Sequence, residues 1–167
     1  GGGFTFSESL DAITTKPAVE NEPVFSNVKG TIAMAKLSGD ANSATSQWFF
    51  NMSNNSAGSA ALDTQNGGFT VFGQITAASQ STLDKIAALV HCDETPVVDI
   101  TAEQCASTDV TISSANLVTI QNVAVMDDDP NSAAGLTVTE NTLIDSDTST
   151  DSSSSSGGGL IWLLGAF

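Results

Sequence analysis

The pattern of apolar and polar positions predicts short β-strands in the first half of the chain. Compact β-prone runs at residues 31–35, 47–51 and 69–75 are separated by clusters of Gly, Asn, Ser and Asp, which favour turns. Gly73 lies inside the third run, where a glycine is typical of a bulge or of the close approach of another strand. Residues 1–27 are punctuated by glycine and proline and are predicted to be irregular.

The period of the apolar residues changes after Ser79 and predicts one helix. Apolar residues then recur with helical spacing, at Leu83, Ile86, Ala87 and Val90. Ser81 and Asp84 resemble a capping box in which Asp replaces Glu. A terminal strand is predicted over residues 117–125, with a bulge because its apolar phase slips.

The composition shifts abruptly after Met126. Residues 127–159 are rich in Ser, Thr, Asp and Gly and hold too little apolar surface to offset their ordering entropy, which predicts a disordered linker. Residues 160–167 are wholly apolar but too short to span a bilayer, which takes ~20 residues. Together the two segments resemble the start of a C-terminal sorting tail of Gram-negative surface proteins. The alternative is that the sequence ends in chance hydrophobic residues.

The charge of the chain is strongly acidic and unevenly placed. The formal net charge is −15, and the four basic residues are Lys16, Lys29, Lys36 and Lys85, so that no Arg occurs anywhere. Binding to nucleic acid or to anionic lipid needs clustered Lys and Arg, so neither is expected as a partner. Contact with a membrane is expected only through the C-terminal tail.

The two cysteines, Cys92 and Cys105, are close in sequence. A disulfide between them would restrain the unfolded chain by about 3 kcal/mol for a loop of this size. Two buried thiols are an alternative, and a metal pair with His91 is another. A structural zinc site needs four ligands, and one His with two Cys leaves one missing, so no metal is predicted.

Several motifs occur in a definite order along the chain. Residues 44–51 read Ala-Thr-Ser-Gln-Trp-Phe-Phe-Asn, Leu62-Asp63 follows, and residues 68–73 read Gly-Phe-Thr-Val-Phe-Gly. Before them come residues 1–4, Gly-Gly-Gly-Phe, and residues 30–40, Gly-Thr-Ile-Ala-Met-Ala-Lys-Leu-Ser-Gly-Asp. In order and spacing, this set resembles the cyclophilin family of peptidyl-prolyl cis-trans isomerases, and residues 1–4 match a family segment that begins with Gln.

The resemblance implies a mostly β fold, a closed antiparallel β-barrel with a flanking helix, over residues 1–126. It assigns a catalytic role to Gln47, which would bond substrate backbone, and to Phe49, which would grip the proline ring. The implied substrate-binding residues are Ala35, Lys36 and Leu37 at a strand edge, with Leu62 and Phe69 in the pocket. An aromatic residue at Phe69, where many relatives carry His, resembles the bacterial type. Read alone, each of these aromatic residues would be an ordinary core residue.

Prolyl isomerisation breaks no bond, so the resemblance implies no cofactor. Its barrier of ~20 kcal/mol is the lost resonance of the twisted amide, and a hydrogen-bond donor aimed at the prolyl nitrogen lowers it. In the family that donor is an Arg ahead of the glycine segment, and the chain has none. We therefore expect an N-terminally truncated chain that lacks the first third of the barrel and is inactive alone.

The expected function of the intact protein is isomerisation of proline-containing polypeptides during the folding of exported proteins. The expected place is the bacterial cell envelope, either the periplasm or the outer surface. A non-catalytic module that binds proline peptides and is displayed on the cell surface is the alternative. An Arg in the missing segment would favour the enzyme.

Overall fold

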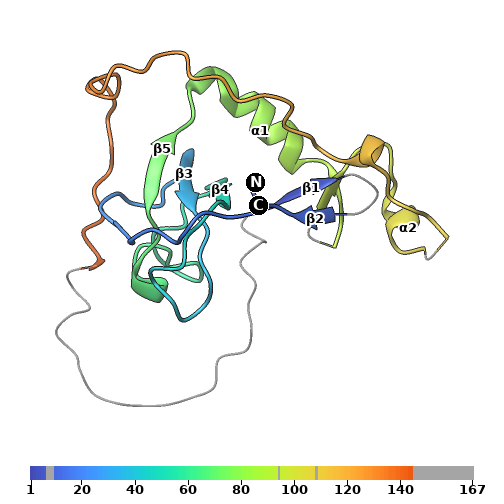
Figure 1. Ribbon diagram of the computed structural model, residues 1–167, viewed down its shortest axis with the longest axis horizontal. Helices are drawn as coiled ribbons and strands as arrows, with labels where there is room; N and C mark the ends of the chain where they lie inside the picture. The colour runs from blue at the N-terminus through green and yellow to red at the C-terminus, as the bar shows by residue number, and fades with distance from the viewer. Residues whose placement is uncertain (7–9, 94, 108, 145–167) are drawn as a thin grey trace.

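The computed structural model describes residues 1–6, 10–93, 95–107 and 109–144 (Figure 1). Its central element is a three-stranded antiparallel sheet in the order β4-β3-β5, formed by β3 (Thr31–Met34), β4 (Trp48–Phe50) and β5 (Val71–Gln74). These are the three predicted strands, each slightly shorter than expected. Apolar side chains on one face of this sheet and in the loop before β5 make the small core, in which Ala33 and Leu62 are completely buried.

The register of β3 against β5 explains the glycine within the third run. Ile32 pairs with Gly73 and Ala33 pairs with Val71, so one residue of β5 is left over and the ladder is irregular at this point. A Cβ atom at Gly73 would lie 2.8 Å from the Cγ2 atom of Ile32. The prediction of a bulge and a close approach at Gly73 is therefore confirmed.

Two small hairpins are separate from the central sheet. β1 (Phe4–Phe6) pairs with β2 (Leu10–Ala12), and β6 (Val90–Cys92) pairs with β7 (Thr95–Val97). The prediction that residues 1–27 are irregular is wrong for the first hairpin. Its strands are only three residues long and too short to show a period.

The predicted helix is α1 (Gln80–Ala87), and Leu83 is its buried residue. The capping box predicted at Ser81 and Asp84 is wrong, because both residues lie inside the helix and the Asp84 carboxylate accepts from the Gln80 Nε2 atom at 2.8 Å. Val90, predicted at the helix end, begins β6 instead.

A complete capping box occurs at a helix that was not predicted, the four-residue α2 (Ala102–Cys105). There Thr101 and Gln104 cap each other. A Sγ–Sγ bond joins Cys92 to Cys105 with 5.1 Å between their Cα atoms, so the predicted disulfide is present and ties the end of β6 to α2.

The described residues form a mostly β fold of small sheets and no closed barrel. The barrel is expected to be incomplete in this chain, so the closed barrel of the intact domain stays a prediction. Among the described residues, β4 and β5 each pair only with β3. The strand predicted over residues 117–125 is wrong, because Leu117 makes a single bridge to Val97 and the residues after it are exposed. A segment with the apolar pattern of a strand stays unpaired where no neighbouring strand offers it a free edge.

Residues 118–138 follow an irregular, exposed path across the molecule and then return to the region of the central sheet (Figure 1). Residues 139–144 contact residues 23–26, although they fall within the predicted linker of residues 127–159. The remainder of that linker and the apolar segment 160–167 lie outside the described residues. In the part of the chain that the structure describes, no helix is long and apolar enough to cross a bilayer.

Candidate functional site

The central sheet brings two of the predicted pocket residues into contact. The ring centroids of Phe49, on β4, and Phe69, just before β5, are 6.0 Å apart with an interplanar angle of 76°. This edge-to-face geometry is a favourable one for aromatic pairs. Phe69 is buried and Phe49 is half-buried, and the small, buried Ala33 lies opposite Phe49 in the strand register. The pair forms an apolar wall with one partly accessible ring.

The Lys36 side chain lies over this wall. Its Nζ atom is 4.7 Å from the centroid of the Phe69 ring and donates to the carbonyl oxygens of Asn66 (2.9 Å) and Gly68 (2.5 Å). Burial lowers the pKa of Lys36 from 10.5 to about 8, and the negative charge of Asp40 partly opposes this shift. The ammonium thus joins the end of β3 to the loop before Phe69 and places a cation on the ring face.

Only some of the backbone N–H and C=O groups of residues 35–37 form hydrogen bonds within the described chain. The Ala35 N–H donates to the Gln47 carbonyl oxygen at 2.9 Å, and the Leu37 N–H donates to the Ser43 Oγ atom at 2.7 Å. The backbone N–H and C=O of Lys36 bond to nothing within the described chain. Among the described residues, the strand edge predicted to pair with a peptide therefore has an unbonded backbone donor and acceptor at Lys36.

The Gln47 side chain is half-buried beside the glycine segment at the start of the chain. A Cβ atom at Gly3 would lie 2.9 Å from the Gln47 Cδ atom, so a larger residue there would displace the amide. Among the described residues the Gln47 amide has no hydrogen-bond partner. It is a donor and an acceptor available to a bound backbone.

Behind the aromatic wall lies a buried polar network centred on Asp63 and Asn27. The Asp63 carboxylate accepts from the Ser26 Oγ atom (2.5 Å), the Asn27 N–H (2.7 Å) and the Asn27 Nδ2 atom (3.1 Å). The Asn27 Nδ2 atom also donates to the carbonyl oxygens of Leu62 (3.3 Å) and Phe69 (3.1 Å). Because the network bonds the backbone on both sides of the loop, it holds Leu62 and Phe69 in place.

Leu62 and Phe69 therefore differ in accessibility from Phe49. Leu62 is 0% exposed and Phe69 is 5% exposed, so of these three side chains Phe49 is the most accessible to a ligand in this structure. The sequence motif includes Asp63 but does not predict its hydrogen-bond partners. The signal that could have found them is the adjacent pair Ser26 and Asn27, because polar side chains that become buried need hydrogen-bond partners.

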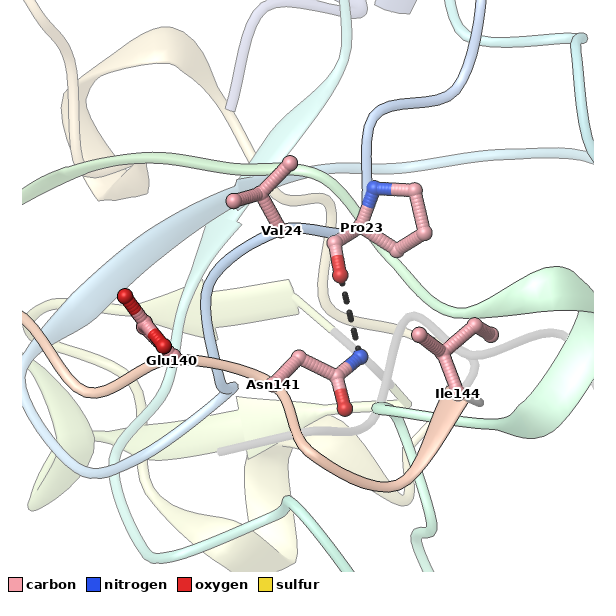
Figure 2. Close-up of a pocket in the computed structure, with 5 residues that line it drawn as sticks. All are labelled: Pro23, Val24, Glu140, Asn141 and Ile144. Carbon is pink, nitrogen blue, oxygen red and sulfur yellow. Dashed lines mark hydrogen bonds between the residues drawn. The ribbon is translucent and has the colours of Figure 1, made fainter. Parts of the chain in front are cut away.

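The cleft in Figure 2 is a different feature of the molecule. It has a volume of about 410 Å³ and is lined by Pro23, Val24, Glu140, Asn141 and Ile144, none of which was predicted as a site residue. Among the described residues, no three His, Cys, Asp or Glu side chains are grouped to hold a metal ion.

The sequence comparison agrees with the geometry of the sheet and its aromatic wall. Residues 1–116 match the family described as cyclophilin type peptidyl-prolyl cis-trans isomerase/CLD. The match includes the central sheet, the Asp63 network and every predicted site residue, and it ends before residues 118–144. Over more than half of its length, the chain belongs to the cyclophilin-type peptidyl-prolyl cis-trans isomerase family.

Proposed function

We propose that the intact domain is a peptidyl-prolyl cis-trans isomerase whose substrates bind across β3 and β4 at the Phe49 ring. The observation that carries this proposal is the contact of Phe49 with Phe69 beside the unpaired Gln47 amide, within the residues that match the family. An apolar wall can hold a pyrrolidine ring, and a free amide can hold the flanking backbone. These are the two groups that a rotation about a prolyl bond needs from its binding site.

Each of these residues would have a separate role in binding the substrate. Phe49 would contact the proline ring, while Phe69, fixed by Lys36 and by the Asp63 network, would keep Phe49 in its orientation. Gln47 would bond the substrate backbone, and the free backbone groups of Lys36 would pair with it at the strand edge. Leu62 would act from within the core.

The polarising donor is the part of the machinery that these 167 residues do not contain, because the chain has no Arg. We propose that it comes from a preceding segment of the protein, and that the polypeptide as written binds prolyl peptides with little or no turnover. The same observation favours the second candidate function, a non-catalytic module that binds proline-containing segments.

The setting that we propose is the bacterial envelope, where the protein would assist exported chains and a C-terminal tail would sort it. The Cys92–Cys105 bond supports this, since disulfides persist in oxidising compartments. The phenylalanine at position 69 supports the bacterial type. Intact mass after thiol alkylation, with and without reductant, tests the setting: two freely alkylated thiols in protein from the periplasm would remove its support.

The activity itself is tested by NMR exchange spectroscopy on an Ala-Pro peptide. We expect binding without fast cis-trans exchange for the chain as written, and exchange once an N-terminal segment that contains the family's Arg is added. Gln47→Ala should then lower kcat/KM while the melting temperature stays nearly constant, because the amide has no partner to lose. Robust turnover by the unextended chain would refute the role given to the Arg, and a stability loss without a kinetic one would make Gln47 structural.

A further inference from the structure

The last described segment, residues 139–144, docks on the loop at residues 23–26, and we refer to it as the strap. The Ser26 N–H donates to the Thr139 carbonyl oxygen and the Asn141 N–H donates to the Val24 carbonyl oxygen, both at 2.8 Å. Phe25 and Glu140 form an antiparallel bridge between these bonds. The strap thus adds a short extended pairing to the domain, and it lies beyond the residues that match the family.

Asn141 is the anchor of the strap. Its Nδ2 atom donates to the carbonyl oxygens of Pro23 (3.1 Å) and Asp63 (2.8 Å), and its Oδ1 atom accepts from the Leu143 N–H at 3.0 Å. Figure 2 shows the amide pointing at the Pro23 carbonyl group. Asn141 is only 9% exposed, whereas Glu140 and Thr142 on either side of it are exposed.

Specific hydrogen bonds must hold the strap, because the residues that lead to it bury little surface. The stretch from Val118 to Glu140 is exposed throughout. Closing so long a connection costs chain entropy, which contacts at the docked end have to offset. The docked end is rich in hydrogen bonds, and most of its side-chain bonds belong to Asn141.

The bonds of Asn141 lead directly to the aromatic wall. Asp63, whose carbonyl oxygen accepts from Asn141, follows Leu62 in the chain, and its carboxylate accepts from Asn27, whose amide bonds Leu62 and Phe69. Pro23, the other acceptor, packs against Gly68. A Cβ atom at Gly68 would lie 2.6 Å from the Pro23 Cβ atom, and Gly68 has a φ of +75°, so only glycine fits here.

We propose that the strap completes the prolyl-peptide site from behind, with Asn141 as a positioning residue that holds Asp63 and Pro23 and thereby fixes Leu62, Gly68 and Phe69. The proposal rests on the proposed function, because the wall it supports is the peptide-binding wall. Undocking the strap would leave the family-matched residues folded but would loosen the loop before β5.

The test uses the full chain, with amide hydrogen exchange and NMR. In Asn141→Ala and in the isosteric Asn141→Asp, which removes the Nδ2 donor, the Leu62 and Phe69 amides should exchange at least about tenfold faster, while the Ala33 amide keeps its rate. Because the Lys36 Nζ atom lies over the Phe69 ring, the ring-current shift of the Lys36 ε-methylene protons should shrink as well. Thr142→Ala, an exposed neighbour, is the matched control and should change none of these signals.

Binding of an Ala-Ala-Pro-Phe peptide to the same variants separates the two proposals. Weaker binding to both Asn141 variants together with faster Phe69 exchange supports the strap. Absence of binding to the unsubstituted chain refutes the proposed function, and the exchange rates still decide the strap. Unchanged amide exchange rates at Leu62 and Phe69 in folded Asn141 variants overturn the proposal that the strap positions the wall.

A measurement on the unsubstituted chain covers the case in which both variants unfold. With increasing guanidinium, the Asn141 and Phe69 amides should come to exchange through one shared opening, since the strap and the wall form one unit. Separate openings with different denaturant slopes would overturn the proposal.

Discussion

The segments 23–74 and 117–138 contrast in how their apolar residues are used. Both carry β-prone runs, but the first forms the central sheet around buried Ala33 and Phe69, whereas the second leaves Val123 at 83% and Val125 at 79% exposure. The first segment also supplies the buried Asn27 amide and the Asp63 carboxylate, which bond the backbone between its short strands. We refer to Ser26, Asn27 and Asp63 as the polar framework. The contrast teaches that a strand pattern leads to an ordered strand only where a sheet edge can pair with it and buried hydrogen bonds, such as those of the polar framework, hold the neighbouring loops.

The largest difference between the segments is expected from truncating one apolar side chain in each. Phe69→Ala should lower the free energy of unfolding by about 3–5 kcal/mol, as buried Phe truncations do, because the wall and the Lys36 contact are lost together. Val123→Ala should stay within about 0.5 kcal/mol, because the residue is exposed. Urea unfolding followed by Trp fluorescence measures both. A comparable loss at Val123 would mean that the second segment is packed in solution.

A second prediction concerns the polar framework. Asp63→Ala leaves the Ser26 hydroxyl and the Asn27 backbone N–H buried without an acceptor, while the Asn27 Nδ2 atom keeps its bonds to the Leu62 and Phe69 carbonyl oxygens. The two unsatisfied donors should cost about 3 kcal/mol. Asp127→Ala, an exposed carboxylate in the other segment, is the matched control and should change the free energy of unfolding by less than about 0.5 kcal/mol. Equal urea unfolding midpoints for the two variants would show that the hydrogen bonds of Asp63 do not stabilise the fold.

The truncation of Phe49 should give a smaller loss of stability than that of Phe69, because its ring is only half-buried. We expect Phe49→Ala to abolish detectable binding of an Ala-Pro peptide while the protein still unfolds cooperatively, and a calorimetric titration measures this. If the peptide bound Phe49→Ala as it binds the unsubstituted chain, the accessible ring of the wall would not be the proline contact.

The smallest expected effect is a pH dependence at Lys36. Its pKa is lowered to about 8 in the folded protein, so between pH 8 and the unfolded value near 10.5 the unfolded chain binds more protons. This contribution to stability is therefore fully present above 10.5 and is lost as the pH falls through about 8. Peptide binding should follow the opposite direction and weaken as the pH rises through 8, because the cation over Phe69 is lost.

Lys36→Arg supplies the control for that pH dependence, since a guanidinium keeps its charge over this range. A pH titration of peptide binding by the two proteins should show a decline for Lys36 and a flat response for Arg. The same decline in both would assign the titration to another group.

Local sequence determined much of the central sheet. The runs at 31–35, 47–51 and 69–75, the close approach at Gly73, the helix at α1 and the Cys92–Cys105 pair were all foreseen, because each depends on side-chain spacing within a few residues or on one pair of thiols. The motif order also identified the family. The contact of Phe49 with Phe69 followed from the motif and not from either residue alone.

Tertiary structure alone decided the rest. Residues 117–125 have the pattern of a strand, yet no neighbouring strand receives them in the described chain, and pairing is a property of two segments. The cation of Lys36 and the amide of Asn141 gain their roles from carbonyl groups 30 positions and 78 to 118 positions away. The carboxylate of Asp63 gains its role from donors on Ser26 and Asn27, which lie 37 and 36 positions away. A buried hydrogen bond has direction and needs its partner within about 3 Å, and only the folded backbone brings such distant groups together.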